Sequence, residues 1–152
     1  MAEGADQRRI FSYLEHRFGI SQTYFADYLL FRSKKSWFLI ANTAYIFTVS
    51  QLKVSQAGLR AFQRVGDFLK PTTRFIQIFG RLATRAKVHI DMPQLQALLE
   101  GKKIHVDISL DNGYVILAIG EDRVLGLGLY IDHMVSSQLP RKEIRDAMLW
   151  DG

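Results

Sequence analysis

The sequence contains no cysteine, and this absence excludes several kinds of site. Disulfides, zinc ribbons, iron–sulfur clusters and thiolate nucleophiles all need the cysteine side chain. A chain without cysteine is typical of a reducing compartment, so we expect cytoplasmic localisation. Hydrophobic residues make up 48% of the 152 positions, which is enough to form a core without covalent cross-links.

Long hydrophobic runs are also missing. The longest, such as residues 114–120, are far too short to span a bilayer. The segment MAEGADQRR at the start of the sequence is polar and lacks the apolar centre of a signal peptide. We therefore expect a soluble protein with no membrane partner.

Catalytic motifs are absent as well. The sequence has no G-x-S-x-G nucleophile elbow, Walker loop or H-E-x-x-H helix, and its carboxylates show no paired acid and base arrangement. The motifs HID at 89–91 and HVD at 105–107 each place a histidine and an aspartate on one strand face, but exposed polar side chains explain them better than a metal site. We expect no enzyme activity, no cofactor and no metal.

Positive charge, by contrast, is abundant and regional. The formal net charge is +5, and the segment 60–87 contains one acid, Asp67. Its basic residues are Arg60, Arg64, Lys70, Arg74, Arg81, Arg85 and Lys87. Such a concentration favours a polyanionic partner, although a solvated surface explains the pattern equally well.

The N-terminal part shows mixed helix and strand patterns. Apolar residues recur at helical spacing from Asp6 to Phe18, and Gly19 follows at the expected C-cap position. The runs DYLLF and SWFLIA, separated by the charged segment RSKKS, predict a β-hairpin. Residues 45–52 are a candidate for a further strand.

The segment KPTTRFIQIFGRLATRAK predicts a helix that starts at Pro71 and Thr72. One face of this helix is apolar, and the opposite face is polar and mostly cationic. The polar face consists of Arg74, Gln77, Arg81, Thr84 and Arg85.

The chain becomes rich in strands after Lys87. VHID predicts a short strand, and a helix follows that Pro93 starts and Gly101 ends. The alternation in IHVDISL at 104–110 predicts a strand that folds back, through a turn at 111–113, onto YVILAIG. A further strand, RVLGLGLYI, comes next. Sequentially paired strands with one inserted helix predict a small mixed barrel.

The glycines of GLGLY raise the question of a nucleotide loop. A dinucleotide fingerprint needs a third glycine, where this chain has Ile131, and it needs a helix to follow. The nucleotide interpretation therefore fails. Within a strand, glycines mark a bulge, a bend or the close approach of another backbone. A structural role is favoured, and contact with an RNA backbone is the functional alternative.

Several short motifs follow one another in order between residues 58 and 146. They are the Gly58-led strand, Pro71-Thr72 opening a helix, the leucine and glycine before Lys102, Gly113-Tyr-Val, Gly126-Leu-Gly and Leu139-Pro-Arg. In this order and spacing they resemble the PUA-like RNA-binding domain appended to RNA cytosine-C5 methyltransferases of the Nol1/Nop2/Sun family. They are also similar, more loosely, to the PUA domain of small ribosome-biogenesis factors.

The resemblance implies a pseudobarrel that recognises structured RNA, ribosomal or transfer RNA, mainly through its backbone. Together with the cationic helix, it gives a set of expected RNA-contacting residues. These are Arg74, Gln77, Arg81, Arg85, Lys102, Lys103, Gly126, Gly128, Arg141 and Lys142. Such domains normally accompany a methyltransferase with catalytic cysteines, which this chain cannot supply. We therefore expect RNA binding without modification.

The sequence as a whole predicts an α+β protein, with an N-terminal α+β module at 1–86 packed on a PUA-like small mixed β-barrel at 87–152. Its expected function is accessory to RNA modification or ribosome biogenesis, with an RNA-modifying enzyme or a ribosomal protein as a further partner. The alternative is a protein-interaction adaptor that makes no direct RNA contact, for which an exposed apolar patch would be the signature. A ligand-binding barrel would instead need converging polar groups in a pocket.

Overall fold

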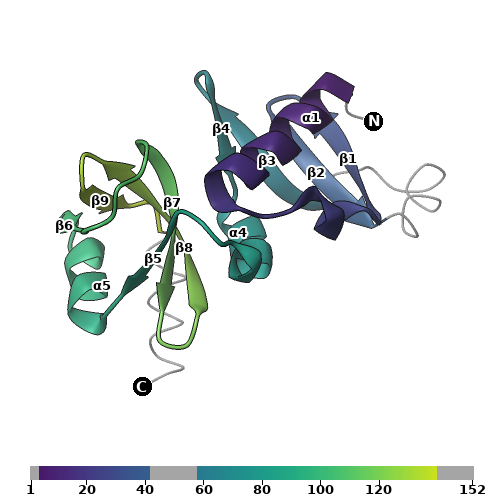
Figure 1. The fold of residues 1–152 in the computed structure, drawn as a ribbon. Coiled ribbons are helices and arrows are strands. Elements are labelled where there is room, and N and C mark those ends of the chain that lie inside the picture. The colour runs from purple at the N-terminus through teal and green to yellow at the C-terminus, as the bar shows by residue number, and fades with distance from the viewer. Residues whose placement is uncertain (1–3, 42–57, 140–152) are drawn as a thin grey trace.

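The computed structural model describes residues 4–41 and 58–139, and it has the predicted α+β architecture (Figure 1). Two sheets are present: a four-stranded sheet with the order β1-β2-β3-β4, and a curled five-stranded sheet with the order β5-β7-β8-β9-β6. No helix in the described ranges is long and apolar enough to cross a membrane.

The chain begins with helix α1, Gly4–Tyr13, which continues into the π-helical stretch η1, Leu14–Phe18. Gly19 ends it with a left-handed φ of 64°, a conformation that glycine adopts at little cost. The side chains of Ile10 and Phe18 are buried in the hydrophobic core. The helix and the C-cap predicted from the sequence are confirmed.

The predicted hairpin is present in the four-stranded sheet as β1 and β2, whose strands continue up to a turn at Lys34 and Lys35. The candidate strand at 45–52 lies outside the described residues. A short 3₁₀ helix, η2, precedes the sheet. The bounds are η2 Gln22–Phe25, β1 Tyr28–Ser33, β2 Ser36–Ala41, β3 Leu59–Val65 and β4 Phe68–Pro71.

The predicted cationic helix is shorter than its sequence pattern indicates. Helix α4 covers Thr73–Phe79, with the Thr72 hydroxyl accepting the N-cap hydrogen bond, and a 3₁₀ turn, η3, Gly80–Leu82, ends it. The prediction of helix beyond residue 82 is wrong. The N–H groups of Thr84 and Arg85 donate to the carbonyl of Phe18 instead of continuing the helical pattern, so tertiary hydrogen bonds redirect the chain.

The strands predicted at VHID, YVILAIG and RVLGLGLYI are present in the five-stranded sheet, the first two displaced by one residue. Helix α5 begins with a capping box between Asp91 and Gln94. Strand β5 pairs in parallel with β7, and the other neighbours are antiparallel. The bounds are β5 Lys87–Ile90, α5 Met92–Leu99, β6 Ile104–His105, β7 Gly113–Ile119, β8 Arg123–Ile131 and β9 Met134–Ser137.

The prediction for residues 104–110 is wrong in length and in partner. Within this segment, strand β6 covers two residues, Ile104 and His105. It pairs with β9, a pairing that the sequence pattern did not indicate. Strand β7 already has β5 on one edge and β8 on the other, so neither edge is free for this segment. A side chain instead satisfies part of the backbone of residues 106–110: the Tyr130 hydroxyl donates a hydrogen bond to the carbonyl of Ile108 at 2.7 Å.

The glycines of β8 lie at a bulge and at close packing contacts. The register of β7 and β8 shifts beside Gly126, whose φ is 155°. A Cβ at Gly126 would lie 2.8 Å from the side chain of Leu139, and one at Gly128 would lie 2.8 Å from the side chain of Val135. Both positions therefore need glycine for structural reasons.

One hydrophobic cluster includes residues from both sheets. Helix α4 lies between them and contacts β3 on one side and β8 on the other. The rings of Phe25 and Phe75 lie 5.9 Å apart, and Phe62 and Phe75 lie 4.9 Å apart. Because the core is shared, the division into units at 1–86 and 87–152 stays a prediction.

Candidate functional site

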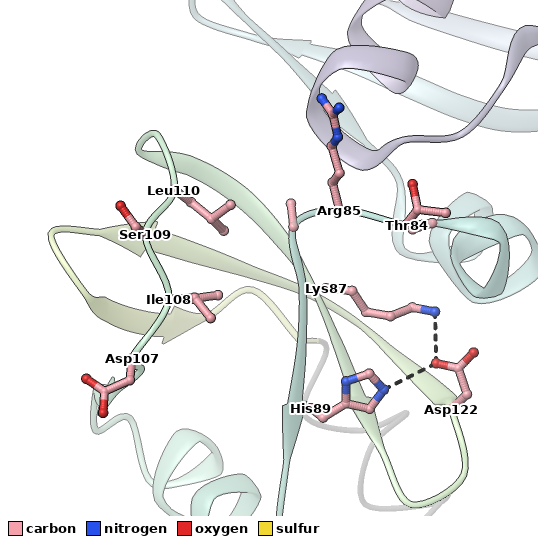
Figure 2. Close-up of a pocket in the computed structure, with 11 residues that line it drawn as sticks. Thr84, Arg85, Lys87, His89, Asp107, Ile108, Ser109, Leu110 and Asp122 are labelled. Atoms are coloured by element: carbon pink, nitrogen blue, oxygen red, sulfur yellow. Dashed lines mark ion pairs between the residues drawn. The ribbon is translucent and has the colours of Figure 1, made fainter.

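A cleft of about 780 Å³ lies between the connection from η3 to β5, strand β5 itself and the irregular segment after β6 (Figure 2). A second cleft, of about 660 Å³, extends from it towards Tyr13, His16 and Arg17. The two share the residues Arg85, Ala86, Ser109 and Leu110. We call the combined surface the joined cleft.

Arg85 is fixed in the centre of the joined cleft by its backbone. Its N–H donates to the carbonyl of Phe18 at 3.0 Å, the N–H of Thr84 donates to the same oxygen at 2.8 Å, and the Thr84 hydroxyl donates to the carbonyl of Gly19 at 3.1 Å. The Arg85 side chain is exposed and points towards η1 (Figure 2). Among the described residues, no carboxylate forms an ion pair with it.

Lys87 lies at the other end of the cleft, where it forms an ion pair with Asp122. Its Nζ lies 2.8 Å from Asp122 Oδ1, and His89 Nε2 lies 3.4 Å from the same oxygen (Figure 2). The hydrogen bond from Lys87 lowers the pKa of Asp122, and His89 contributes in the same direction. Asp122 therefore stays ionised and neutralises Lys87.

Arg17 borders the second part of the joined cleft. Its Nε donates to the carbonyl of Tyr114 at 2.8 Å and its Nη1 donates to that of Asp111 at 2.7 Å. Its Nη2 is buried and has no hydrogen-bond partner among the described residues. Burial lowers the pKa of Arg17, and burial raises that of the neighbouring Tyr13 to about 12.

The structure does not bring the expected RNA-contacting residues onto one surface. Arg85 lies in the joined cleft. Arg81 is exposed on η3, and Arg74 lines a separate cleft of about 370 Å³ with Arg60 and Lys70. Gln77 donates to the carbonyl of Leu125 at 3.2 Å and so helps to pack α4 against β8.

The remaining expected residues are further away or enclosed. Lys102 and Lys103 are exposed in the loop after α5, on the side of the five-stranded sheet away from α4 (Figure 1), and Lys102 pairs with Glu100 at 3.1 Å. Gly126 and Gly128 are buried by neighbouring side chains and present no open backbone. The predicted contacts Arg141 and Lys142 lie outside the described residues.

Sequence reasoning missed His16 and Arg17 as residues of the site. The partners of Arg17 are backbone carbonyls 94 and 97 residues away, and no local pattern reveals such a contact. The HID and HVD motifs do not combine: within 4–41 and 58–139, no group of three or more histidine, aspartate or glutamate side chains is placed to hold a metal ion.

Comparison with curated proteins finds one distant similarity. Over 107 residues the chain is 28% identical to "Ribosomal RNA small subunit methyltransferase F" of Psychromonas ingrahamii (strain DSM 17664 / CCUG 51855 / 37), a match that covers 67% of this chain and 22% of that protein. The chain thus spans about a fifth of the length of this relative. No family model matches the chain. The resemblance to a domain associated with RNA methyltransferases is supported, whereas the PUA-like assignment stays a prediction.

Proposed function

We propose that this protein binds structured RNA, ribosomal or transfer RNA, without catalysing a reaction on it, and that it acts alongside RNA modification or ribosome biogenesis. The RNA backbone lies in the joined cleft. The observation that carries the proposal is Arg85, an exposed guanidinium that its backbone holds at the point where the two parts of the cleft meet. The similarity to a ribosomal RNA methyltransferase supports RNA as the polyanion.

The charges of the joined cleft favour phosphate near Arg85 and η1. Asp122 is neutralised by Lys87, and Asp107 is 99% exposed at the outer end of the cleft (Figure 2). Arg17, His16 and Asp111 line the inner part with Arg85, and the charge of Asp111 acts on Arg17. Because Arg85 forms no ion pair among the described residues, a phosphate can pair with it without displacing an internal partner. Arg81 is exposed on η3, and its carbonyl accepts a hydrogen bond from Lys87 Nζ at 3.4 Å, so it adds a cation beside the Lys87 end of the cleft.

The test is fluorescence anisotropy of structured and single-stranded RNA over a series of salt concentrations, with an acidic polymer as the competitor. We expect Arg85→Glu to weaken RNA binding about tenfold or more and to reduce the salt slope by about one, because a phosphate contact is lost. Adding Arg81→Glu should weaken binding further, for all sequences alike.

Lys35→Glu is the matched control, because it makes the same change of charge on the exposed β1–β2 turn, away from the joined cleft. It should leave the affinity within about twofold. Equal losses in Arg85→Glu and Lys35→Glu would reduce the interaction to general charge attraction. Wild-type protein that binds RNA no better than it binds the polymer would contradict the proposed function.

A protein-interaction adaptor is the second candidate, and one observation favours it. Phe68 is 70% exposed and Ile131 is 49% exposed, and both line one apolar surface. An adaptor would use that surface for a protein partner and would leave the joined cleft to solvent. The adaptor function predicts that Arg85→Glu leaves RNA binding unchanged, whereas Phe68→Ala weakens binding of the protein partner.

A further inference from the structure

A third concave surface adjoins the joined cleft and differs from it in character. It has a volume of about 710 Å³ and lies between α1, the β3–β4 hairpin and the β7–β8 pair. Its apolar lining consists of Tyr13, Phe68, Leu69, Tyr114, Leu129 and Ile131. We call this surface the apolar groove.

Phe68 is the most exposed large hydrophobic residue described, at 70%. It opens β4 directly after the turn at Gly66 and Asp67, and its partner across the hairpin, Val65, is itself 45% exposed. An aromatic ring in this position contributes little to the core of the protein. Its free face is instead available to a flat apolar ligand.

The apolar groove continues directly from the joined cleft. Tyr13, Arg17 and Asn112 line both surfaces, so a chain that follows the cleft past Arg17 reaches the groove. Arg9 is a second cation on the border of the groove. The one acid in its lining, Asp67, lies 3.7 Å from the guanidinium of Arg64, which offsets its charge.

We propose that the apolar groove receives an unpaired base of the RNA whose backbone lies in the joined cleft, and that this base stacks on Phe68. The inference rests on the proposed function and narrows its substrate class to RNA with a bulged, looped or terminal unpaired nucleotide. In a continuous duplex the faces of the bases are covered by their neighbours, whereas an unpaired base can leave the stack at small cost. Stacking on an aromatic ring tolerates any base, because every base has a π-face.

The surroundings of the groove favour a base over an apolar segment of a protein. A nucleotide brings a phosphate together with its flat base, and the exposed Arg9 can pair with that phosphate on the border of the groove. Arg17, whose nitrogens are bonded or buried, adds positive charge to the same region. An apolar peptide would leave the Arg9 guanidinium, which forms no ion pair within the described residues, without a counterion, unless the peptide also carried acidic residues.

The experiment compares two RNA hairpins that differ only by one bulged nucleotide, with the fluorescent base 2-aminopurine at the bulge. We expect the wild-type protein to bind the bulged RNA about tenfold more tightly and to quench the fluorescence of the bulged base. Phe68→Ala should remove both the preference and the quenching, and should leave the affinity for the continuous hairpin unchanged. Phe68→Tyr should retain both.

Tyr24→Ala is the matched control, because Tyr24 is 53% exposed on η2 and lines none of the three surfaces. It should behave as wild type. A preference that persists in Phe68→Ala, or an equal loss on both hairpins, would overturn the inference while the proposed function stands, and a protein partner would then become the better occupant. If the wild-type protein binds neither hairpin better than it binds an acidic polymer, the proposed function itself fails.

Discussion

Arg17 and Tyr114 are 97 residues apart in the sequence, and a hydrogen bond of 2.8 Å joins the Nε of the first to the carbonyl oxygen of the second. A second bond, from Nη1 to the carbonyl of Asp111, joins the same guanidinium to the segment that leads into β7. Arg17 is thus a structural connection between η1 and the five-stranded sheet. It also borders both the joined cleft and the apolar groove.

Replacing Arg17 by methionine should therefore destabilise the fold. Arg17→Met keeps the aliphatic contacts of the side chain and removes two hydrogen bonds donated by a charged group, so we expect the free energy of unfolding to fall by about 1.5–3 kcal/mol. Urea unfolding measures this change. Arg8→Met, on the exposed surface of α1, is the control and should change stability by less than about 0.5 kcal/mol. Equal effects in the two variants would refute the structural role of Arg17.

Tyr13 should make the protein lose stability at alkaline pH. Burial raises the pKa of its phenol from 10.0 to about 12 in the folded state, and Tyr114 adds to the rise while Arg17 opposes it. Because the folded pKa is the higher one, this contribution is complete below pH 10 and is lost as the pH rises from 10 towards 12.

The variant Tyr13→Phe isolates this contribution. Its free energy of unfolding should fall less steeply than that of the wild type between pH 10 and pH 12, and the two should run in parallel at lower pH. Urea denaturation at several pH values gives both curves. Curves that stay parallel throughout would mean that Tyr13 ionises as readily in the folded chain as in the unfolded chain.

Local patterns predicted the elements whose hydrogen bonds are local. The helix that ends at Gly19, the hairpin of β1 and β2, helix α5 and strands β7 and β8 all have caps, turns or apolar runs that the sequence displays. The prediction errors occur where groups distant in the sequence determine the backbone conformation. The helix after Thr72 stops because the carbonyl of Phe18 accepts from the N–H groups of Thr84 and Arg85. Residues 106–110 do not pair with β7, because both edges of β7 are already occupied.

The candidate site was predicted less completely for the same reason. Regional charge pointed to Arg85, which lies in the joined cleft, but the helical pattern grouped it with Arg74 on a stripe that the fold does not form. No sequence pattern indicated Arg17, because its partners are backbone carbonyls 94 and 97 residues further along the chain. A sequence shows where charged residues are concentrated, whereas the cleft in which some of them meet depends on the tertiary structure.

The glycines of β8 should be needed for packing. A Cβ at Gly128 would lie 2.8 Å from Val135 Cγ1 and 3.2 Å from Leu117 Cδ1, inside a fully buried region. We expect Gly128→Ala to lower the free energy of unfolding by about 1–3 kcal/mol, because the core is overpacked. Thermal unfolding measures the loss.

A double mutant tests whether Val135 is the cause. Gly128→Ala with Val135→Ala should be more stable than the sum of the two single losses predicts, because each change makes room for the other. Additive losses would show that the strain arises elsewhere, for example in the backbone. RNA affinity of the folded Gly128→Ala protein should match that of the wild type, since Gly128 is enclosed by side chains.

Gly19, whose carbonyl accepts the Thr84 hydroxyl beside the joined cleft, should be more sensitive to substitution than Gly66. Its φ of 64° is left-handed, and a Cβ there would also collide with the Thr84 hydroxyl. Gly66 has nearly the same backbone conformation, with φ of 61°, and a Cβ there would meet no atom within 4 Å. The pair therefore separates the conformational cost of a left-handed alanine from the cost of the collision.

We expect Gly66→Ala to lower the free energy of unfolding by about 1 kcal/mol and Gly19→Ala to lower it by at least about 2 kcal/mol more. In Gly19→Ala the connection that holds Arg85 should also shift, because Thr84 must move away from Gly19. RNA affinity should then fall in Gly19→Ala and stay unchanged in Gly66→Ala, when both are measured at a temperature where each protein is folded. Equal stability and equal affinity in the two variants would mean that Thr84 can move without disturbing the cleft, and the positioning role assigned to its contact with Gly19 would be wrong.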